Sequence, residues 1–271
     1  MGQFACIQFN QDNILTSKKE IAVVKEVYYA NRRSYEIKVG MPKEALSKRQ
    51  KIKLEAQLDA YEIEYVAAEE ALEDLFENKV IVSKEQLMPY LAKPILDYIN
   101  YYGLCHKNRL FWKVGIIVGR SEQMMGVLTS IVQEISELVL FADTPYMYKD
   151  LIGEIYEVSR LKAKGSVPHA RILREMDIIF DCQGTRDYAK WCSPNVIYID
   201  WNHYYKRKEG RFKDYPPMIW HDFEILCGRQ IVPIEILQGL FKVEGISKRQ
   251  TALMFKELNL KISRVYNACI S

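Results

Sequence analysis

A short stretch in the middle of the chain combines residue types that could hold a phosphate group. The apolar run 113–118 ends at Gly119, which Arg120 and Ser121 follow, and an amphipathic segment begins after them. This pattern predicts a strand, a tight turn and a helix. Backbone N–H groups at the start of a helix, together with the helix dipole, favour an anion. We therefore predict a phosphate-binding turn at these three residues; the alternative is a buried strand that turns into a helix without a ligand.

A carboxylate follows the next apolar run of the sequence. Residues 137–142 end at Asp143, about where a dinucleotide fold places the acid that binds the ribose 2′-hydroxyl. Arg120 could instead meet a 2′-phosphate or a diphosphate with a bidentate guanidinium. A structural role is the alternative for Asp143, because it begins the turn Asp-Thr-Pro. The predicted cofactor is NAD or NADP, with a slight preference for NAD.

Two further apolar segments have the form of buried strands. Residues 176–184 and 195–202 are rich in β-branched side chains, and both reach an aspartate followed by small polar residues. Short runs of this kind, separated by helices, indicate a parallel sheet that is buried on both faces. The polar ends of such strands lie at one edge of the sheet, where ligands of open α/β sheets bind. This edge would include Gly119, Gly184 and Asn202.

These motifs together resemble a known family of nucleotide-binding domains. Val118-Gly-Arg-Ser121, Asp177-Ile-Ile followed by Gly184, and Ile197-Tyr-Ile-Asp-x-Asn202 are similar to the nucleotide-binding half of methylenetetrahydrofolate dehydrogenase/cyclohydrolases. The likeness to shikimate dehydrogenases is looser. The resemblance as a whole covers about residues 111–202. The resemblance implies a Rossmann-type NAD(P)-binding domain in which Gly119, Arg120 and Ser121 face the cofactor phosphates and Gly184 flanks the nicotinamide. It does not extend to folate chemistry, because the family's catalytic Tyr-x-x-x-Lys has no counterpart in the N-terminal half.

One histidine is a candidate for proton transfer. His221 follows a short apolar segment, and its unperturbed pKa near neutrality suits a general acid or base. A lone histidine beside aromatic residues is more often structural, so the alternative is a buried histidine without a catalytic role. The sequence shows no partner residue for it.

Two regions outside the predicted nucleotide-binding motifs could instead bind a nucleic acid. A basic, tyrosine-rich loop at 203–213 could bind an anionic substrate or single-stranded nucleic acid, and it could equally be a solvated surface loop. Two predicted helices, 233–242 and 247–258, have the arrangement of a helix–turn–helix. A nucleic acid is nevertheless not favoured as a partner, because 38 basic residues are balanced by 35 acidic ones.

The N-terminal part of the chain reads as a unit of its own. We predict an α/β protein with a smaller α+β domain at 1–103, and a Rossmann-like parallel sheet with C-terminal helices at 104–271. The first domain contains a predicted hairpin at 20–40, a charged helix from Pro42 to about Tyr61 and a second helix at about 67–76. No part of it has the spacing of a metal site or of a nucleophile with its base.

Composition limits the class of protein. The six cysteines lie far apart without a C-x-x-C pair, which is typical of reduced thiols in a cytoplasmic protein. No apolar run is long enough to span a membrane. The predicted partners are a small-molecule ligand and, in a homo-oligomer, further copies of the chain. We predict an NAD(P)-dependent oxidoreductase-like protein acting on an unknown small molecule; the alternatives are a non-catalytic nucleotide- or partner-binding protein and a nucleic-acid-binding protein.

Overall fold

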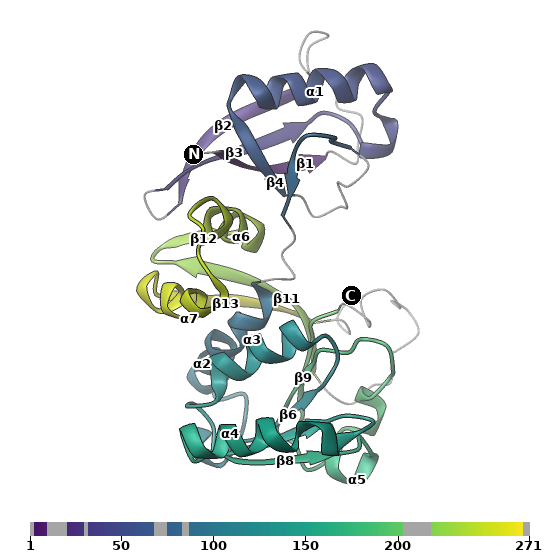
Figure 1. Cartoon of the computed structure of the whole chain (residues 1–271), viewed down its shortest axis with the longest axis vertical. Helices are drawn as coiled ribbons and strands as arrows, with labels where there is room; N and C mark the ends of the chain where they lie inside the picture. The colour runs from purple at the N-terminus through teal and green to yellow at the C-terminus, as the bar shows by residue number, and fades with distance from the viewer. Residues whose placement is uncertain are drawn as a thin grey trace. The chain divides into compact units, whose positions relative to one another are not determined.

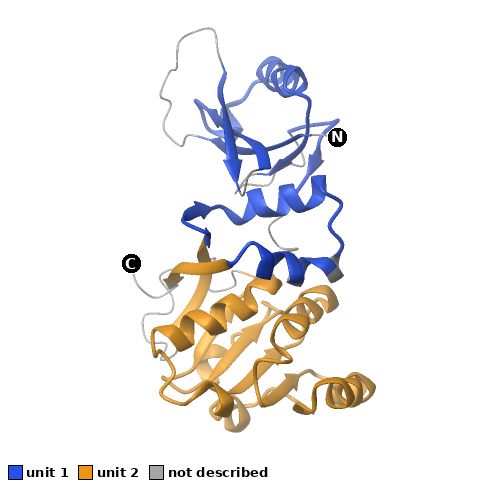
Figure 2. Ribbon diagram, turned by 90° about the vertical axis from the view of Figure 1, so that its left-hand side faces the viewer, with its two compact units in different colours: residues 1–84, 226–259 blue, residues 85–225, 260–271 orange. Residues whose placement is uncertain are grey.

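The computed structural model describes residues 3–9, 21–29, 32–67, 75–82, 87–202 and 218–267. The chain forms two compact units, residues 1–84 with 226–259 and residues 85–225 with 260–271 (Figure 2). The expected division at residue 103 differs from these units in two places. Residues 85–103 belong to the second unit, and the C-terminal helix pair belongs to the first.

A sheet of five described strands forms the centre of the first unit. Its order is β2 (Ala22–Tyr29), β3 (Arg32–Val39), β1 (Gln3–Phe9), β4 (Ile63–Ala67) and β5 (Val80–Ile81). β2 and β3 form the predicted antiparallel hairpin. The remaining pairs of neighbouring strands are parallel, so the unit is not a simple meander.

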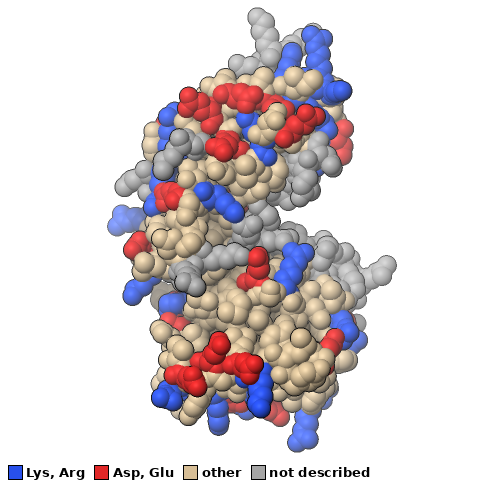
Figure 3. All heavy atoms as spheres, viewed as in Figure 1, with Lys and Arg blue, Asp and Glu red and all other residues tan. Residues whose placement is uncertain are grey.

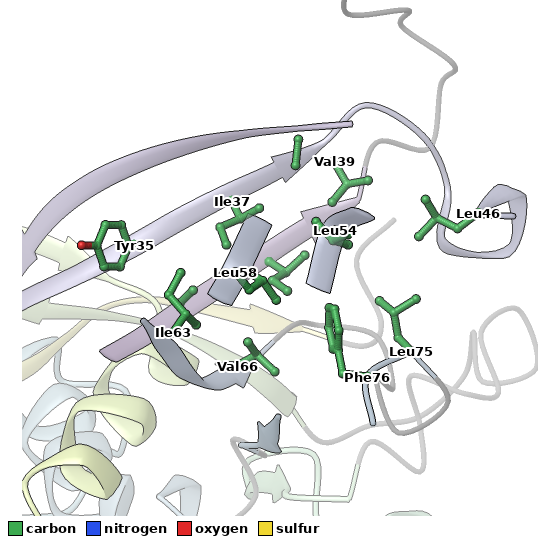
Figure 4. Close-up of a cluster of buried hydrophobic side chains, with 13 residues drawn as sticks. Tyr35, Ile37, Val39, Leu46, Leu54, Leu58, Ile63, Val66, Leu75 and Phe76 are labelled. Carbon is green, nitrogen blue, oxygen red and sulfur yellow. The ribbon is translucent and has the colours of Figure 1, made fainter. Parts of the chain in front are cut away.

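A helix crosses from β3 to β4 over one face of this sheet. After the 3₁₀ helix η1 (Lys43–Ala45), helix α1 (Lys48–Ala60) begins at Ser47, whose N–H donates to Gln50 Oε1 at 2.9 Å in a capping box. Leu54 and Leu58, four residues apart, point from the helix toward the sheet and are fully buried (Figure 4). Burial of each leucine contributes about 1.5–3 kcal/mol, which fixes the helix on this face.

The opposite face of the sheet is covered from the far end of the chain. Helix α6 (Ile234–Val243) packs against β1, and α7 (Lys248–Glu257) follows it; the short strand β12 (Gln230–Val232) precedes the pair. Successive residues of β1 are buried on both faces, so the sheet requires a second covering layer. Helices α6 and α7 begin and end within two residues of the bounds predicted from the sequence. The sequence placed them in the other domain because periodicity does not identify the surface that a helix covers.

The second unit is built on a parallel sheet with the strand order of a dinucleotide-binding fold. The order is β11 (Met218–Cys227), β10 (Ile197–Asp200), β9 (Ile178–Asp181), β6 (Lys113–Ile117), β7 (Glu137–Phe141) and β8 (Lys162–Ser166), with β13 (Leu260–Asn267) paired to β11. All neighbours from β11 to β8 are parallel. Renumbered along the chain, the six strands have the order 3-2-1-4-5-6 of the Rossmann fold. The predicted Rossmann-like α/β sheet is confirmed.

Helices cover both faces of this sheet (Figure 1). The 3₁₀ helix η3 (Met88–Leu91) leads into α2 (Ala92–Tyr101), which packs with α3 (Ser121–Ile131). Helix α5 (Ala170–Leu173) and the 3₁₀ helix η6 (Ala189–Trp191) join a core cluster with Ile117 and Tyr198. The remaining helices are η4 (Arg109–Phe111), η5 (Pro145–Tyr148) and α4 (Lys149–Ser159).

Pro94 lies in the first turn of α2, which begins at Ala92, so the missing N–H of the proline is not needed there. One local expectation in the first hundred residues needs correction. The helix expected at about 67–76 begins on a residue of β4, since Ala67 is the last residue of that strand. Residues 68–74 lie outside the described part of the chain, as does the basic loop at 203–213.

Candidate functional site

The carboxyl ends of β6 and β9 lie side by side although β7 and β8 separate them in the sequence. Ile117 at the end of β6 pairs with Asp181 at the end of β9. The chain leaves β6 toward β7 on one side and later enters β9 on the other side. This is the topological switch point, where the loops diverge and ligands of open α/β sheets bind.

The turn after β6 is fitted against the loop after β9. A Cβ atom added at Gly119 would lie 2.0 Å from the carbonyl oxygen of Cys182, so only glycine fits there. The N–H of Arg120 donates to the same carbonyl oxygen at 3.4 Å. Gly119 is therefore required for the contact between the two loops. This contact explains why the residue is a glycine, whether or not a ligand binds there.

Helix α3 begins directly after this contact. Arg120 is its N-cap residue, with extended backbone and no capping hydrogen bond from its side chain. Arg120, Ser121 and Glu122 are exposed, and the first turn of an α-helix has amide groups without intrahelical partners. The positive end of the helix dipole thus points out of the sheet edge. Arg120 and Glu122 cancel in formal charge, so any attraction for an anion comes from the amides, the dipole and the reach of the guanidinium.

A fully buried carboxylate shapes the loop after β9. Asp181 Oδ1 accepts hydrogen bonds from the N–H groups of Gln183 at 2.8 Å and Gly184 at 3.0 Å, while Oδ2 accepts from the Tyr198 hydroxyl at 2.7 Å. Burial raises the pKa of Asp181, and these three hydrogen bonds oppose the rise. Because its acceptor sites are used internally, Asp181 acts as a brace for the loop.

The braced loop contacts the end of β10 and the first turns of α3. Gly184 has φ +61°, and a Cβ added to it would lie 2.3 Å from Cβ of Asn202. The Gln123 side-chain amide donates to Asn202 Oδ1 at 3.3 Å. Of the sequence-predicted residues, Gly119, Arg120, Ser121, Gly184 and Asn202 are thus assembled around one edge. Gln123, which the sequence analysis missed, is the side chain that connects the α3 turn to β10.

Asp143 lies at the same edge and has a partner that was not foreseen. It follows the end of β7, and its Oδ1 is 3.0 Å from Nη1 of Arg186 in the loop after β9. Both side chains are more than half exposed. The only sequence signal for Arg186 was its place two residues beyond Gly184, which does not by itself predict a partner.

His221 is buried in the first half of β11, at the level where the neighbouring β10 ends. The strand register pairs Ile199 with Trp220, so His221 stands one step further on, beside Asp200. The side chain is 8% exposed, and its Nε2 lies 3.8 Å from Oδ2 of Asp222. Two carboxylates therefore belong to the surroundings of this histidine, which the sequence analysis had left without a partner.

Thiol and metal chemistry are not supported at this edge by the described residues. Burial raises the pKa of the Cys182 thiol well above its ordinary value and that of Cys192 to about 12, so neither is a thiolate near neutrality. The described residues contain no group of three or more His, Cys, Asp or Glu side chains that could hold a metal ion. Nor does any helix in the described ranges have the length and apolar character needed to cross a membrane.

Comparison with known proteins finds similarity in structure only. No protein-family model matches the sequence, and no curated protein sequence matches it. Similar solved structures include L-tryptophan dehydrogenase from Nostoc punctiforme, with 9% identity, a TM-score of 0.41, and coverage of 83% of this chain and 66% of that one. A shikimate 5-dehydrogenase from Listeria monocytogenes, solved with shikimate and NAD, has 10% identity, a TM-score of 0.38, and coverage of 82% and 85%.

A third similar structure covers much less of its own chain. It is the Δ(1)-pyrroline-2-carboxylate reductase from Thermococcus litoralis, solved with NADH and L-proline, with 14% identity and a TM-score of 0.28. The match covers 42% of this chain and 36% of that one, so it spans about a third of the relative's length. At these scores the assignment of the fold rests on the strand order of this chain.

Proposed function

We propose that the second unit binds NAD or NADP at the carboxyl edge of its sheet, and that the protein is an NAD(P)-dependent oxidoreductase-like protein acting on a small molecule. One observation carries the proposal: the switch point of a 3-2-1-4-5-6 sheet coincides with the Gly119 turn and the start of α3. A parallel sheet with this order offers a dinucleotide the crevice between the loops after β6 and β9.

The residues at this edge fit the parts of a dinucleotide. The amides at the start of α3, with Ser121 and the Arg120 guanidinium, would hold the diphosphate. Asp143 at the end of β7 would meet the adenosine ribose, and Gly184 with Asn202 would flank the nicotinamide. When bound, the nicotinamide supplies hydride transfer, while the chain binds and orients it.

In this proposal His221 holds the proton that accompanies hydride transfer. Its imidazole is buried in β11 at the level where β10 ends, and the strand register places it beside Asp200. Histidine exchanges protons near neutrality, which suits the oxidation of an alcohol or amine and the reverse reduction. Asp222 is a second carboxylate close to the same ring, at 3.8 Å.

Calorimetry with oxidised and reduced NAD and NADP tests the binding step. We expect heat of binding with at least one of the four, and a much weaker signal for Gly119→Ala because an added Cβ would displace the Cys182 carbonyl. Gly153→Ala is the matched control, since a Cβ at Gly153 in α4 meets no atom within 4 Å. Absence of heat with all four dinucleotides at millimolar concentration would refute the proposal.

A turnover assay distinguishes the proposed oxidoreductase from the alternative, a non-catalytic dinucleotide-binding protein. Absorbance of the reduced nicotinamide is followed with a panel of hydroxy acids, amino acids and cyclic imines. We expect turnover of at least one compound by the wild-type protein, and loss of turnover with unchanged cofactor affinity in His221→Asn. Binding without turnover across the panel would favour the non-catalytic alternative.

A further inference from the structure

The ion pair between Asp143 and Arg186 spans the end of β6. Asp143 follows β7, Arg186 follows β9, and β6 lies between those two strands in the sheet. The pair therefore bridges the loops on either side of the Gly119 turn. In a dinucleotide-binding fold the end of the second strand, here β7, is the position of the adenosine ribose, where an acid selects a 2′-hydroxyl and a nearby arginine accommodates a 2′-phosphate.

The guanidinium is held at one nitrogen only. Nη1 of Arg186 donates to Asp143 Oδ1 at 3.0 Å and to the Tyr188 hydroxyl at 3.5 Å. Tyr188 is 2% exposed and belongs to the core cluster of the sheet, so it is a fixed point for the arginine. Within the described residues, Nε and Nη2 of Arg186 have no hydrogen-bond acceptor. Two donors of an exposed, anchored guanidinium are thus available for a ligand.

We propose that Arg186 makes this site selective for the 2′-phosphate of NADP over the 2′-hydroxyl of NAD. The inference rests on the proposed function, and it reverses the slight preference for NAD that Asp143 alone suggests. A bidentate contact of Nε and Nη2 with a phosphate is charge-assisted, and planar guanidinium geometry matches it.

In this arrangement the repulsion between the Asp143 carboxylate and the phosphate is outweighed by the attraction of Arg186. Arg186 lies next to Asp143 and would lie between the two anions, so each anion is closer to the cation than to the other anion. Coulomb interaction weakens with distance, and attraction to the nearer guanidinium exceeds repulsion from the more distant carboxylate. Asp143 then positions the arginine and no longer discriminates against NADP.

Calorimetry of the wild-type protein with NADP⁺ and NAD⁺ at low ionic strength is the first test. We expect NADP⁺ to bind at least about tenfold more tightly, which corresponds to about 1.4 kcal/mol. The preference should shrink as salt is added, because both side chains of the pair are exposed and screened. NAD⁺ binding as tightly as NADP⁺, or more tightly, would overturn the inference and leave the proposed function intact. Failure of both to bind would refute the proposed function instead.

Two variants and a control assign the preference to the residue. Arg186→Ala should lower affinity for NADP⁺ by about tenfold or more and leave that for NAD⁺ within about twofold, because the released Asp143 then repels the 2′-phosphate. Asp143→Asn should keep the NADP⁺ preference. Arg174→Ala, which removes another exposed arginine, at the amino end of the sheet, is the matched control and should change neither affinity.

The affinities of nucleotide fragments test the role of Arg186 without the nicotinamide half of the cofactor. Adenosine 2′,5′-bisphosphate should bind more tightly than adenosine 5′-monophosphate to the wild-type protein, and about equally to Arg186→Ala. Equal loss of both fragments in Arg186→Ala would indicate that the arginine only supports the loop after β9, and would overturn the inference.

Discussion

Gly119→Ala is the most direct test of how the candidate site is built. The added Cβ would lie 2.0 Å from the Cys182 carbonyl oxygen and 2.5 Å from Cα of Gln183, whereas ordinary contact begins at 3.4 Å. The obstructing atoms are backbone, so they cannot be moved by a change of rotamer. The loop after β9 must therefore retreat from the β6 turn.

The loss of stability in Gly119→Ala follows from the contacts that the loop after β9 loses. Overpacking in a fitted interior costs about 1–3 kcal/mol, and loss of the hydrogen bond from Arg120 N–H to the Cys182 carbonyl adds about 1 kcal/mol. We expect the free energy of unfolding to fall by about 2–4 kcal/mol. Gly153→Ala should have the opposite sign and stabilise by about 0.5–1 kcal/mol, because it replaces an exposed glycine inside α4.

Urea denaturation followed by tryptophan fluorescence is suited to this measurement. All four tryptophans, at 112, 191, 201 and 220, lie in the second unit, so their emission reports that unit alone. Trp201 directly follows β10 and Trp220 lies in β11, and both side chains are buried. Unchanged stability of Gly119→Ala would refute the loop-to-loop contact as the reason for glycine at this position.

Three further predictions concern the loop after β9 and the core beneath it. Gly184→Ala should destabilise by about 1–3 kcal/mol in the same urea assay, because φ is +61° and Asn202 fills the space; wild-type stability would contradict the fitted loop. The pKa of Asp181 is raised in the folded protein, so its protonation stabilises the fold; this contribution to the free energy of unfolding is complete below pH 3.8 and declines as pH rises through the folded-state pKa. Asp181→Asn should flatten this dependence of the unfolding free energy on pH, and an unchanged slope would exclude Asp181 as its source. Cys182 and Cys192 should resist iodoacetamide near neutrality until the protein unfolds, as mass spectrometry would show, and rapid native labelling would contradict their burial.

The described surface has no large patch of basic side chains on the face drawn in Figure 3. On the face drawn in Figure 3, acidic and basic side chains of the described residues lie intermixed. In the first unit, Ile234 to Phe241 of α6 are all buried, so that helix serves the core of its unit. The basic loop at 203–213 remains outside the described residues, and salt-dependent oligonucleotide binding by the full chain is the measurement that addresses it.

The sequence by itself determined the strand, turn and helix at 113–131 and the apolar strands that follow them in the second unit. A strand that is buried on both faces needs a continuous apolar run, and a helix with one buried face needs periodic apolar residues, so 113–131 could be interpreted correctly from composition and spacing. Glycine at the end of β6 also marked the turn. These are signals carried by neighbouring residues.

Strands whose own residues carry only weak signals were missed, because the prediction relied on neighbouring residues alone. β8, with the sequence Lys-Ala-Lys-Gly-Ser, has no apolar run and is a strand because it pairs with β7. β4 was overlooked because its five residues include Glu64 and Tyr65 among the apolar ones. An edge or short strand is stabilised by the ladder beside it, which is a property of the sheet.

Only the tertiary structure decided which distant residues meet. Strand order placed β9 beside β6 and so brought Gly184 and Asn202 to the Gly119 turn. It also paired Asp143 with Arg186 across 43 positions, although each residue alone is an ordinary surface charge. Pairing over such separations depends on the order in which strands assemble, and no periodicity of the chain encodes that order. The same holds for α6, whose apolar stripe is visible in the sequence while the sheet that it covers, at the other end of the chain, is not.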